Sequence, residues 1–216
     1  MAAPLLPTPP VSAPVDGRRA RGDRTRATFV GEAVQLASVD GLEGLTIAHL
    51  AARLGVPKSS VHAALGSKAD LQVAVLRRTR EILIARVIAP SLEAAPGLPR
   101  LLAVGDAWFA DLSGGVFEGG CVLSSASSEL DGRPGPARDE LRSIMTEWLD
   151  FLAGNARAAI EAGDIGRSAD PAQVAFELQA VGLTANWHHQ LFGGDAAFRA
   201  ARVAWSAALE RHAPRR

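Results

Sequence analysis

Side chains that donate hydrogen bonds or carry positive charge are concentrated between residues 46 and 68. They are Thr46, Lys58, Ser59, Ser60, His62 and Lys68. Ammonium, hydroxyl and imidazole groups suit the oxygens of phosphates and the edges of nucleic-acid bases. By contrast, no pair of acidic residues stands out as suited to acid–base catalysis. The residue types therefore indicate recognition of a polyanion rather than catalysis.

Two short helices are needed to position these groups. The first is expected to run from a cap at Thr46 to a stop at Gly55, and the second has Val61, Ala64 and Leu65 on its inner side. Together they predict a helix-turn-helix from Thr46 to Leu65, whose second helix enters the major groove of DNA while the first contacts the backbone. The candidate DNA-binding residues are Thr46, Lys58, Ser59, Ser60, His62, Ala63 and Lys68.

Lys68 lies in the first turn of a further helix, which Ser67 and Asp70 are predicted to cap. Its charge opposes the helix dipole there, at a cost of about 0.3–1 kcal/mol. A DNA phosphate at this helix end would be attracted by both the dipole and the ammonium group. The alternative is an exposed lysine whose small cost is tolerated, and these residues alone leave both interpretations open.

The charge of the chain is divided between its two parts. The 216 residues have no formal net charge, but residues 1–80 contain 11 Lys and Arg against 6 Asp and Glu. A basic N-terminal part joined to an acidic C-terminal part indicates a polyanionic partner for the N-terminal part alone. The single cysteine, Cys121, excludes an intrachain disulfide and a multi-cysteine zinc site. No apolar run reaches the length of a membrane span and no signal peptide is visible, so we expect a cytoplasmic protein.

Apolar periodicity and abundant alanine predict an all-α protein of about nine helices. The first helix is expected to begin at Asp23 and to stop at Gly41, and the helix that follows Ser67 is expected to reach about Ile88. Later helices are predicted at residues 100–112, 137–162, 171–192 and 195–212. Five prolines within the first 14 residues make residues 1–21 a predicted disordered tail.

The stretch LTIAHLAARLGVPKSSVHAALGSKADL resembles the DNA-binding segment of the tetracycline-repressor (TetR) family of bacterial regulators. The resemblance extends from about Arg24 to about Leu83. Residues 119–141, GGCVLSSASSELDGRPGPARDEL, resemble a segment in the ligand-binding half of some members. The family resemblance implies phosphate contacts for Thr46 and Lys68. It also implies a homodimer, in which the last two long helices pair with those of the partner as a four-helix bundle.

Three positions depart from the family pattern. Pro57 stands where serine is usual, His62 where tyrosine is usual, and Ala64-Leu65 where a His-Phe-like pair is usual. An imidazole is a shorter donor than a phenol and is positive only when protonated. The operator sequence is therefore harder to predict than the scaffold.

Aromatic residues beyond the DNA-binding segment supply a candidate effector pocket. Such residues could line an apolar pocket with few charges, although a helical core would use them in any case. The candidate ligand-binding residues are Trp108, Cys121, Trp148, Phe176 and Trp187.

Cys121 also supports a second hypothesis, a cytosolic helical enzyme with this thiol as nucleophile and His188 or His189 as its base. No known nucleophile signature surrounds Cys121, so a buried structural cysteine is the stronger interpretation. Adjacent histidines on a helix point about 100° apart and do not chelate one metal ion together. We expect no metal site, no catalytic residue and no cofactor.

The sequence therefore predicts a non-enzymatic, DNA-binding transcriptional regulator. We expect a disordered tail over residues 1–21, a helix-turn-helix domain over 22–84, and an effector-binding and dimerisation domain over 85–216. The expected partners are double-stranded operator DNA, a second copy of the chain and an unidentified small-molecule effector, with no membrane. The expected action is repression at a palindromic operator, relieved by a small, largely apolar effector.

Overall fold

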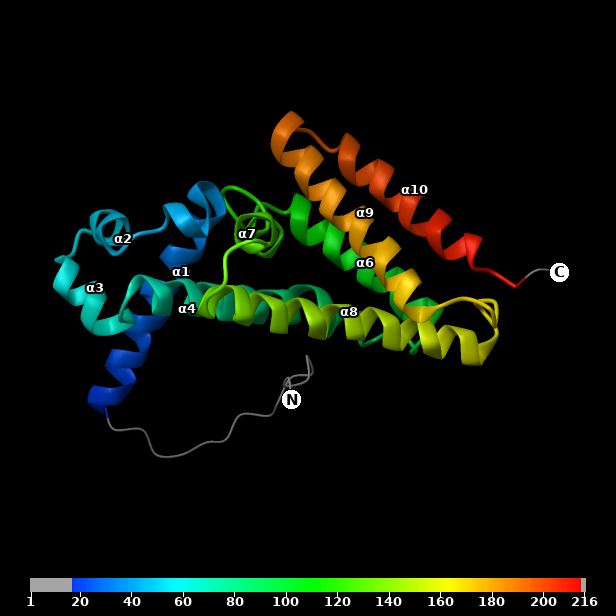
Figure 1. Cartoon of the computed structure of the whole chain (residues 1–216), viewed down its shortest axis with the longest axis horizontal. Coiled ribbons are helices and arrows are strands. Elements are labelled where there is room, and N and C mark those ends of the chain that lie inside the picture. Colours follow the sequence, from blue (N-terminus) through cyan, green and yellow to red (C-terminus); the bar gives the residue numbers. More distant parts are fainter. Residues whose placement is uncertain (1–16, 215–216) are drawn as a thin grey trace. The chain divides into compact units, whose positions relative to one another are not determined.

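The computed structural model describes residues 17–214, which form helices joined by loops and include no strand (Figure 1). The predicted all-α class is confirmed, with nine helices of eight residues or more in this part of the chain. The helices form two compact units: an N-terminal unit of residues 17–81 and 117–142, and a body of residues 82–116 and 143–214. The first division falls between residues 81 and 82, and residues 117–142 cluster with the N-terminal unit.

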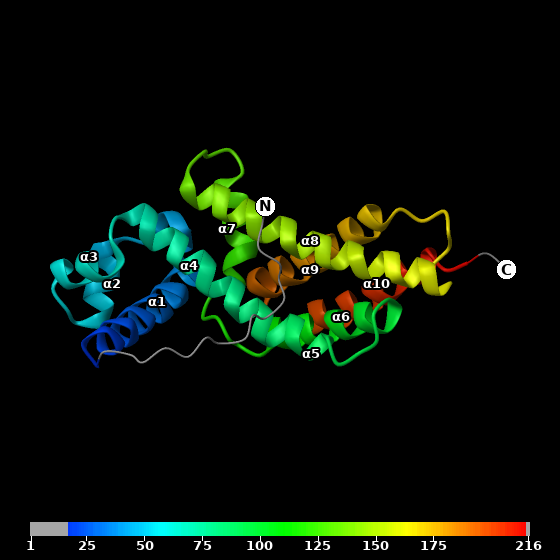
Figure 2. The same ribbon diagram turned by 90° about the horizontal axis from the view of Figure 1, so that it is seen from below.

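The N-terminal unit contains five helices or parts of helices. They are α1 (Gly17–Gly44), α2 (Ile47–Leu54), α3 (Lys58–Leu65), α4 (Lys68–Leu83, of which residues 68–81 belong here) and α7 (Val122–Leu130). Of these, α1, α2 and α3 lie side by side (Figure 2). The inner face of α1 is the predicted one, because Phe29, Ala33, Leu36 and Ala37 are all buried.

The start of α1 differs from the prediction. The helix begins at Gly17, so Asp23 lies inside it and the prediction of Asp23 as the N-cap is wrong. The last five residues of the predicted tail, 17–21, belong to this helix, and residues 1–16 lie outside the described part of the chain. Gly41 interrupts the helix as predicted, because its φ of 75° lies in the left-handed region that favours glycine.

The helix that starts at Lys68 continues further than the sequence indicates. After Leu83 it passes through one π-helical turn, η1 (Ile84–Ile88), into the short α5 (Ala89–Ser91). The N–H of Ala89 bonds to the carbonyl of Ile84, five residues back. The adjacent Pro90 has no N–H with which to continue the α-helical pattern, which accounts for the wider turn. Proline therefore alters this helix without ending it.

The body consists of α6 (Leu98–Ser113), α9 (Pro171–Phe192), α10 (Ala196–Arg211) and most of α8 (Pro136–Ala162), each within two residues of a predicted helix. Helix α10 packs against α9 and α6. Trp108 of α6 is 5% exposed and meets Trp148 of α8 edge to face, with ring centroids 5.1 Å apart. No helix in the described residues is long and apolar enough to cross a membrane.

Gly182 allows α9 to approach this aromatic core closely. A Cβ atom at Gly182 would lie 2.0 Å from the Trp108 ring, which is itself held between Trp148 and Trp205. The absence of a side chain at this position therefore serves packing within one chain.

We predict that Gly182→Ala destabilises the protein, because the buried Trp108 ring cannot yield to an added methyl group. The expected loss in the free energy of unfolding is about 1–3 kcal/mol, measured by urea denaturation. Gly154→Ala in α8 is the matched control, since nothing lies within 4 Å of its added Cβ. That substitution should be neutral or stabilising by up to about 1 kcal/mol. Equal stability of the two variants would contradict the packing role of Gly182.

Candidate nucleic-acid interface

Helices α2 and α3 form the predicted helix-turn-helix. The Thr46 hydroxyl oxygen accepts a hydrogen bond from the His49 N–H at 3.0 Å and caps α2. Gly55 ends α2 with a φ of 65°, and its N–H bonds back to Ala51 and Ala52. Both expected caps of α2 are therefore confirmed, and the turn directs the chain into α3.

Helix α3 has distinct inner and outer sides. Val61 and Leu65 are buried against the unit, and Ala64 is half-buried. The outer side carries donors and one small residue, all of them exposed: Lys58, Ser59, Ser60, His62 and Ala63. The structure thus brings the five candidates of α3 together on one accessible surface.

Pro57 occupies the N-cap position of α3. Its side chain has no oxygen and makes no capping hydrogen bond, while its backbone carbonyl accepts from the Ser60 N–H at 3.0 Å. The exposed start of α3 is therefore open to acceptors from solvent or a ligand.

A hydrogen bond from Arg26 stabilises the C-terminal end of α3, and a capping box at Ser67 stabilises the start of α4. The Arg26 guanidinium on α1 donates to the carbonyl of Ala64 at 2.5 Å. At the start of α4, Asp70 accepts from the N–H and hydroxyl of Ser67, and Ser67 accepts from the N–H of Asp70. These hydrogen bonds lower the pKa of Asp70, so the predicted capping box remains ionised and intact at neutral pH.

Lys68 lies next to the C-terminal end of α1. Its ammonium nitrogen donates to the backbone carbonyl of Glu43 at 2.7 Å and lies 3.5 Å from the Glu43 carboxylate. Desolvation acts to raise the pKa of Glu43, but the hydrogen bond from Gln72 and the charges of Lys68 and Arg133 outweigh it, so the pKa is lowered. Contacts with the negative end of one helix thus offset the position of Lys68 at the positive end of another.

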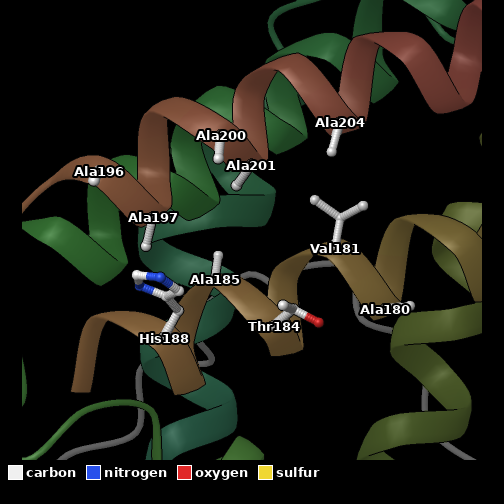
Figure 3. Close-up of a pocket in the computed structure, with 10 residues that line it drawn as sticks. All are labelled: Ala180, Val181, Thr184, Ala185, His188, Ala196, Ala197, Ala200, Ala201 and Ala204. Carbon is white, nitrogen blue, oxygen red and sulfur yellow. The ribbon is translucent and has the colours of Figure 1, made fainter. Parts of the chain in front are cut away.

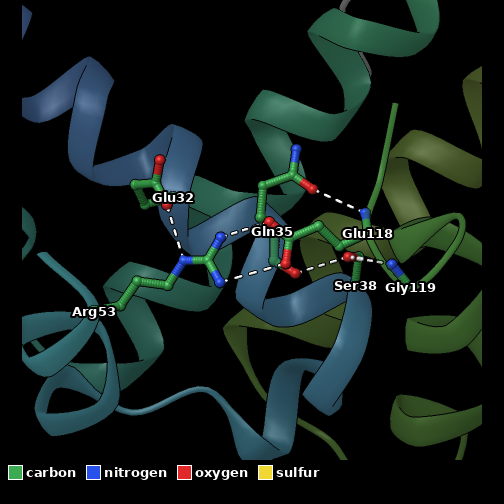
Figure 4. Close-up of polar contacts among 6 residues, drawn as sticks. All are labelled: Glu32, Gln35, Ser38, Arg53, Glu118 and Gly119. Carbon is green, nitrogen blue, oxygen red and sulfur yellow. Dashed lines mark hydrogen bonds and ion pairs between the residues drawn. The ribbon is translucent and has the colours of Figure 1, made fainter. Parts of the chain in front are cut away.

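Arg53 of α2 connects the helix-turn-helix to two other segments (Figure 4). Its Nε donates to Glu32 of α1 at 2.9 Å, and its two terminal nitrogens donate to the carboxylate of Glu118 at 2.5 and 3.3 Å. Hydrogen bonds to Glu118 and Glu32 raise the pKa of Arg53, which therefore stays charged at any pH the protein encounters.

The loop that carries Glu118 is also bound directly to α1. The Glu118 N–H donates to the side chain of Gln35 at 3.0 Å, and the Gly119 N–H donates to the hydroxyl of Ser38 at 2.9 Å (Figure 4). A Cβ atom at Gly119 would lie 2.2 Å from the Ser38 carbonyl oxygen, so only glycine permits this approach. We call these contacts of residues 118–119 with Arg53, Glu32, Gln35 and Ser38 the loop clamp.

Helix α7 extends the same attachment. It packs along α1, and its Glu129 carboxylate accepts from the Glu43 N–H at 3.0 Å. The family resemblance assigned residues 119–141 to the ligand-binding half, whereas the structure packs them within the N-terminal unit. Sequence reasoning missed the clamp residues, and the only local signal for them was the Gly119-Gly120 pair beside an acidic residue.

The five candidate ligand-binding residues are divided between the two units, and between buried and exposed positions. Trp108 and Trp148 pack in the body core, whereas Cys121 precedes α7 in the N-terminal unit. Phe176 and Trp187 are 65% and 55% exposed on α9. Within the body, the exposed Phe176 and Trp187 thus differ in burial from the tryptophan pair, and a common pocket for all five residues stays a prediction.

The residues of the nucleophile hypothesis lie on separate units. Cys121 belongs to the N-terminal unit, while His188 and His189 lie on α9 in the body. The Nδ1 of His189 lies 2.9 Å from the carbonyl of Gly194, which fixes that ring against its own helix end. In the part of the chain that the structure describes, no three His, Cys, Asp or Glu side chains are grouped as metal ligands.

Comparisons with known proteins agree with this arrangement. The family described as tetracyclin repressor-like, C-terminal domain, matches residues 97–205. A TetR-family transcriptional regulator from Cytophaga hutchinsonii is 20% identical, with a TM-score of 0.78 over 91% of this chain and 98% of that chain. A TetR transcriptional regulator from Chloroflexus aurantiacus is 20% identical, with a TM-score of 0.82 over 89% and 98%.

A third solved structure contains ligands. AibR in complex with isovaleryl coenzyme A and operator DNA is 19% identical, with a TM-score of 0.69 over 88% of this chain and 99% of that chain. At these identities the structures share the fold with this chain. Among curated proteins, none matches the sequence significantly.

We predict that Gly119→Ala loosens the loop clamp, because its Cβ would collide with the rigid Ser38 backbone. Amide hydrogen exchange should become faster in residues 35–38 and 117–120, and in α2 through the weakened contact of Glu118 with Arg53. Gly132→Ala is the control in the same unit, since nothing lies within 4 Å of its added Cβ. Unchanged exchange in Gly119→Ala would show that the loop does not depend on this close approach.

Proposed function

The chain belongs to the tetracycline-repressor family of DNA-binding transcriptional regulators, and from that premise we propose that it is a homodimeric repressor released from a palindromic operator by a small, largely apolar effector. The observation that carries the proposal is the row of exposed donors on α3, which projects from a helix-turn-helix with both α2 caps in place.

The outer side of α3 has the chemistry required for groove contacts. Lys58 carries a positive charge, Ser59 and Ser60 can donate or accept hydrogen bonds, and Ala63 permits close approach. His62 offers an imidazole N–H to a phosphate or a base edge. In the proposal this side of α3 faces the major groove, and α2 lies across the backbone.

Thr46 and Lys68 are proposed to bind phosphates on either side of that groove. The Thr46 oxygen accepts from His49, which leaves the hydroxyl hydrogen to donate to a phosphate oxygen. The Lys68 ammonium has three hydrogens, and its contacts with the carbonyl and the carboxylate of Glu43 use two, which leaves one for a phosphate. The contacts with Glu43 thus orient Lys68 and are compatible with a phosphate contact.

An apolar face on α9 and α10 supports the proposed homodimer. The exposed large side chains Phe176, Trp187 and Leu191 follow one stripe of α9, and Val203 of α10 is 71% exposed. A groove of about 530 Å³ lies between the two helices, lined mainly by alanines (Figure 3). The Nδ1 atom of His188 borders this groove, is buried, and has no hydrogen-bond partner among the described residues.

A second copy of the chain is the occupant that fits this face. Apolar patches of this kind are unfavourable in water, and a two-fold symmetric contact would bury the same stripe on both protomers. Phe176 and Trp187, which the sequence suggested as effector contacts, are therefore reassigned to the dimer interface in this proposal.

The proposed effector site lies in the body beside the indole N–H of Trp148. The Trp148 indole N–H donates to the Gln179 side chain at 2.6 Å, which places a polar group of α9 beside the aromatic rings. A largely apolar ligand with one polar group suits such surroundings. AibR, which has the same fold, binds isovaleryl coenzyme A together with operator DNA, and this supports an organic effector for the present chain.

We predict that Lys58→Ala weakens binding to a duplex captured by the wild-type protein from genomic fragments. The loss of one phosphate or base contact should lower affinity and reduce the slope of log K against log salt by up to about 0.9. Fluorescence anisotropy at several salt concentrations measures both. Arg157→Ala, which removes one exposed charge from the body, is the control and should retain the wild-type slope. Identical slopes for all three proteins would remove Lys58 from the interface.

We also predict that Trp187→Glu yields a monomer, because a carboxylate would be buried twice across the two-fold axis. Sedimentation velocity measures the change in mass. Leu102→Glu is the matched control, since Leu102 is a partly exposed apolar residue on α6, and that variant should remain a dimer. A Trp187→Glu protein that still sediments as a dimer would require another interface.

A further inference from the structure

The first turns of α1 extend beyond the core of the N-terminal unit. Residues 21–28 are all exposed, and Phe29 is the first buried residue among residues 20–44 of the helix. Figures 1 and 2 both show this part of α1 projecting past α3. Because residues 21–28 bury no side chain, tertiary packing contributes little to the stability of this part of α1. These exposed residues are available for a surface interaction.

This helix end is strongly basic. The sequence RRARGDRTR, residues 18–26, contains five arginines and one aspartate. Arg21 and Arg24 are exposed and form no ion pair with any carboxylate whose side chain the structure describes. The first turn of α1 contains no acidic residue, and Asp23 is the one acidic residue among residues 18–26.

Arg26 places this basic segment relative to the recognition helix. Its bond to the Ala64 carbonyl attaches α1 to the last turn of α3, within the same unit. Because a helix rises about 1.5 Å per residue, the backbone of Arg24 lies about 3 Å, and that of Arg21 about 7.5 Å, further along α1 from this attachment. Successive phosphates of one strand advance about 3.4 Å along the duplex axis, so the long side chains of Arg21 and Arg24 can reach different phosphates.

We propose that Arg21 and Arg24 form a second DNA-contacting surface, which binds backbone phosphates flanking the half-site that α3 reads. This inference rests on the proposed function and extends the interface beyond the helix-turn-helix. Guanidinium groups bind phosphate oxygens in a bidentate manner, and they do so without regard to base sequence. The segment therefore adds affinity and salt dependence rather than sequence preference.

The test compares operator binding by the wild type and by Arg21→Ala/Arg24→Ala. Each lost phosphate contact lowers the salt slope by about 0.9, so the double variant should lose up to about 1.8. Its loss in affinity should consequently be about tenfold greater at 50 mM than at 200 mM salt. Arg21→Lys/Arg24→Lys retains both charges and should keep most of the wild-type slope.

The control is Arg157→Ala/Arg167→Ala, which removes two exposed charges from the body. If this variant lowers the slope as much as Arg21→Ala/Arg24→Ala does, total charge alone explains the effect and the inference is overturned. A wild-type slope in Arg21→Ala/Arg24→Ala also overturns it, while the proposed function stands. If the wild type itself binds no duplex, the proposed function and this inference fail together.

Discussion

The position of the helix-turn-helix depends on one guanidinium group. Arg53 of α2 binds Glu32 of α1 on one side and Glu118 of the loop on the other, so three segments distant in sequence meet at a single side chain. A lysine could not reproduce this arrangement, because a point charge cannot satisfy two carboxylates in a fixed planar geometry. With α2 fixed in this way, the Gly55 turn and the Arg26 contact at Ala64 define where α3 projects.

Glu118 of this contact also lies close in sequence to the body, where the effector is proposed to bind. The chain leaves the body after Val116, and Glu118 is the second residue of the following segment. A displacement of the C-terminal end of α6 would therefore reach Arg53 through a loop that Gln35 and Ser38 bind to α1. In the proposed dimer, a modest shift of the recognition helices would remove contacts from both half-sites of a palindrome at once. Coupling of this kind must be reciprocal between effector and operator.

Local signals made much of this arrangement predictable from sequence. The caps at Thr46, Gly55 and Ser67 depend on residues within four positions of one another, and each is present as expected. The clamp was not predictable, because Glu118 lies 65 residues from Arg53 and nothing in either local sequence specifies the pairing. Solvent exposure was equally unpredictable, because Trp108 and Trp187 both lie in predicted helices, yet one is buried and the other lies on the surface.

The central claim is that α3 reads duplex DNA as part of a symmetric dimer. Selection of bound sequences from a pool of random duplexes tests it most directly. A symmetric dimer should enrich an inverted repeat whose half-site centres are separated by about one helical turn, roughly 34–36 Å, or a multiple of it. Enrichment of sequences without two-fold symmetry, or no enrichment over the starting pool, would contradict it.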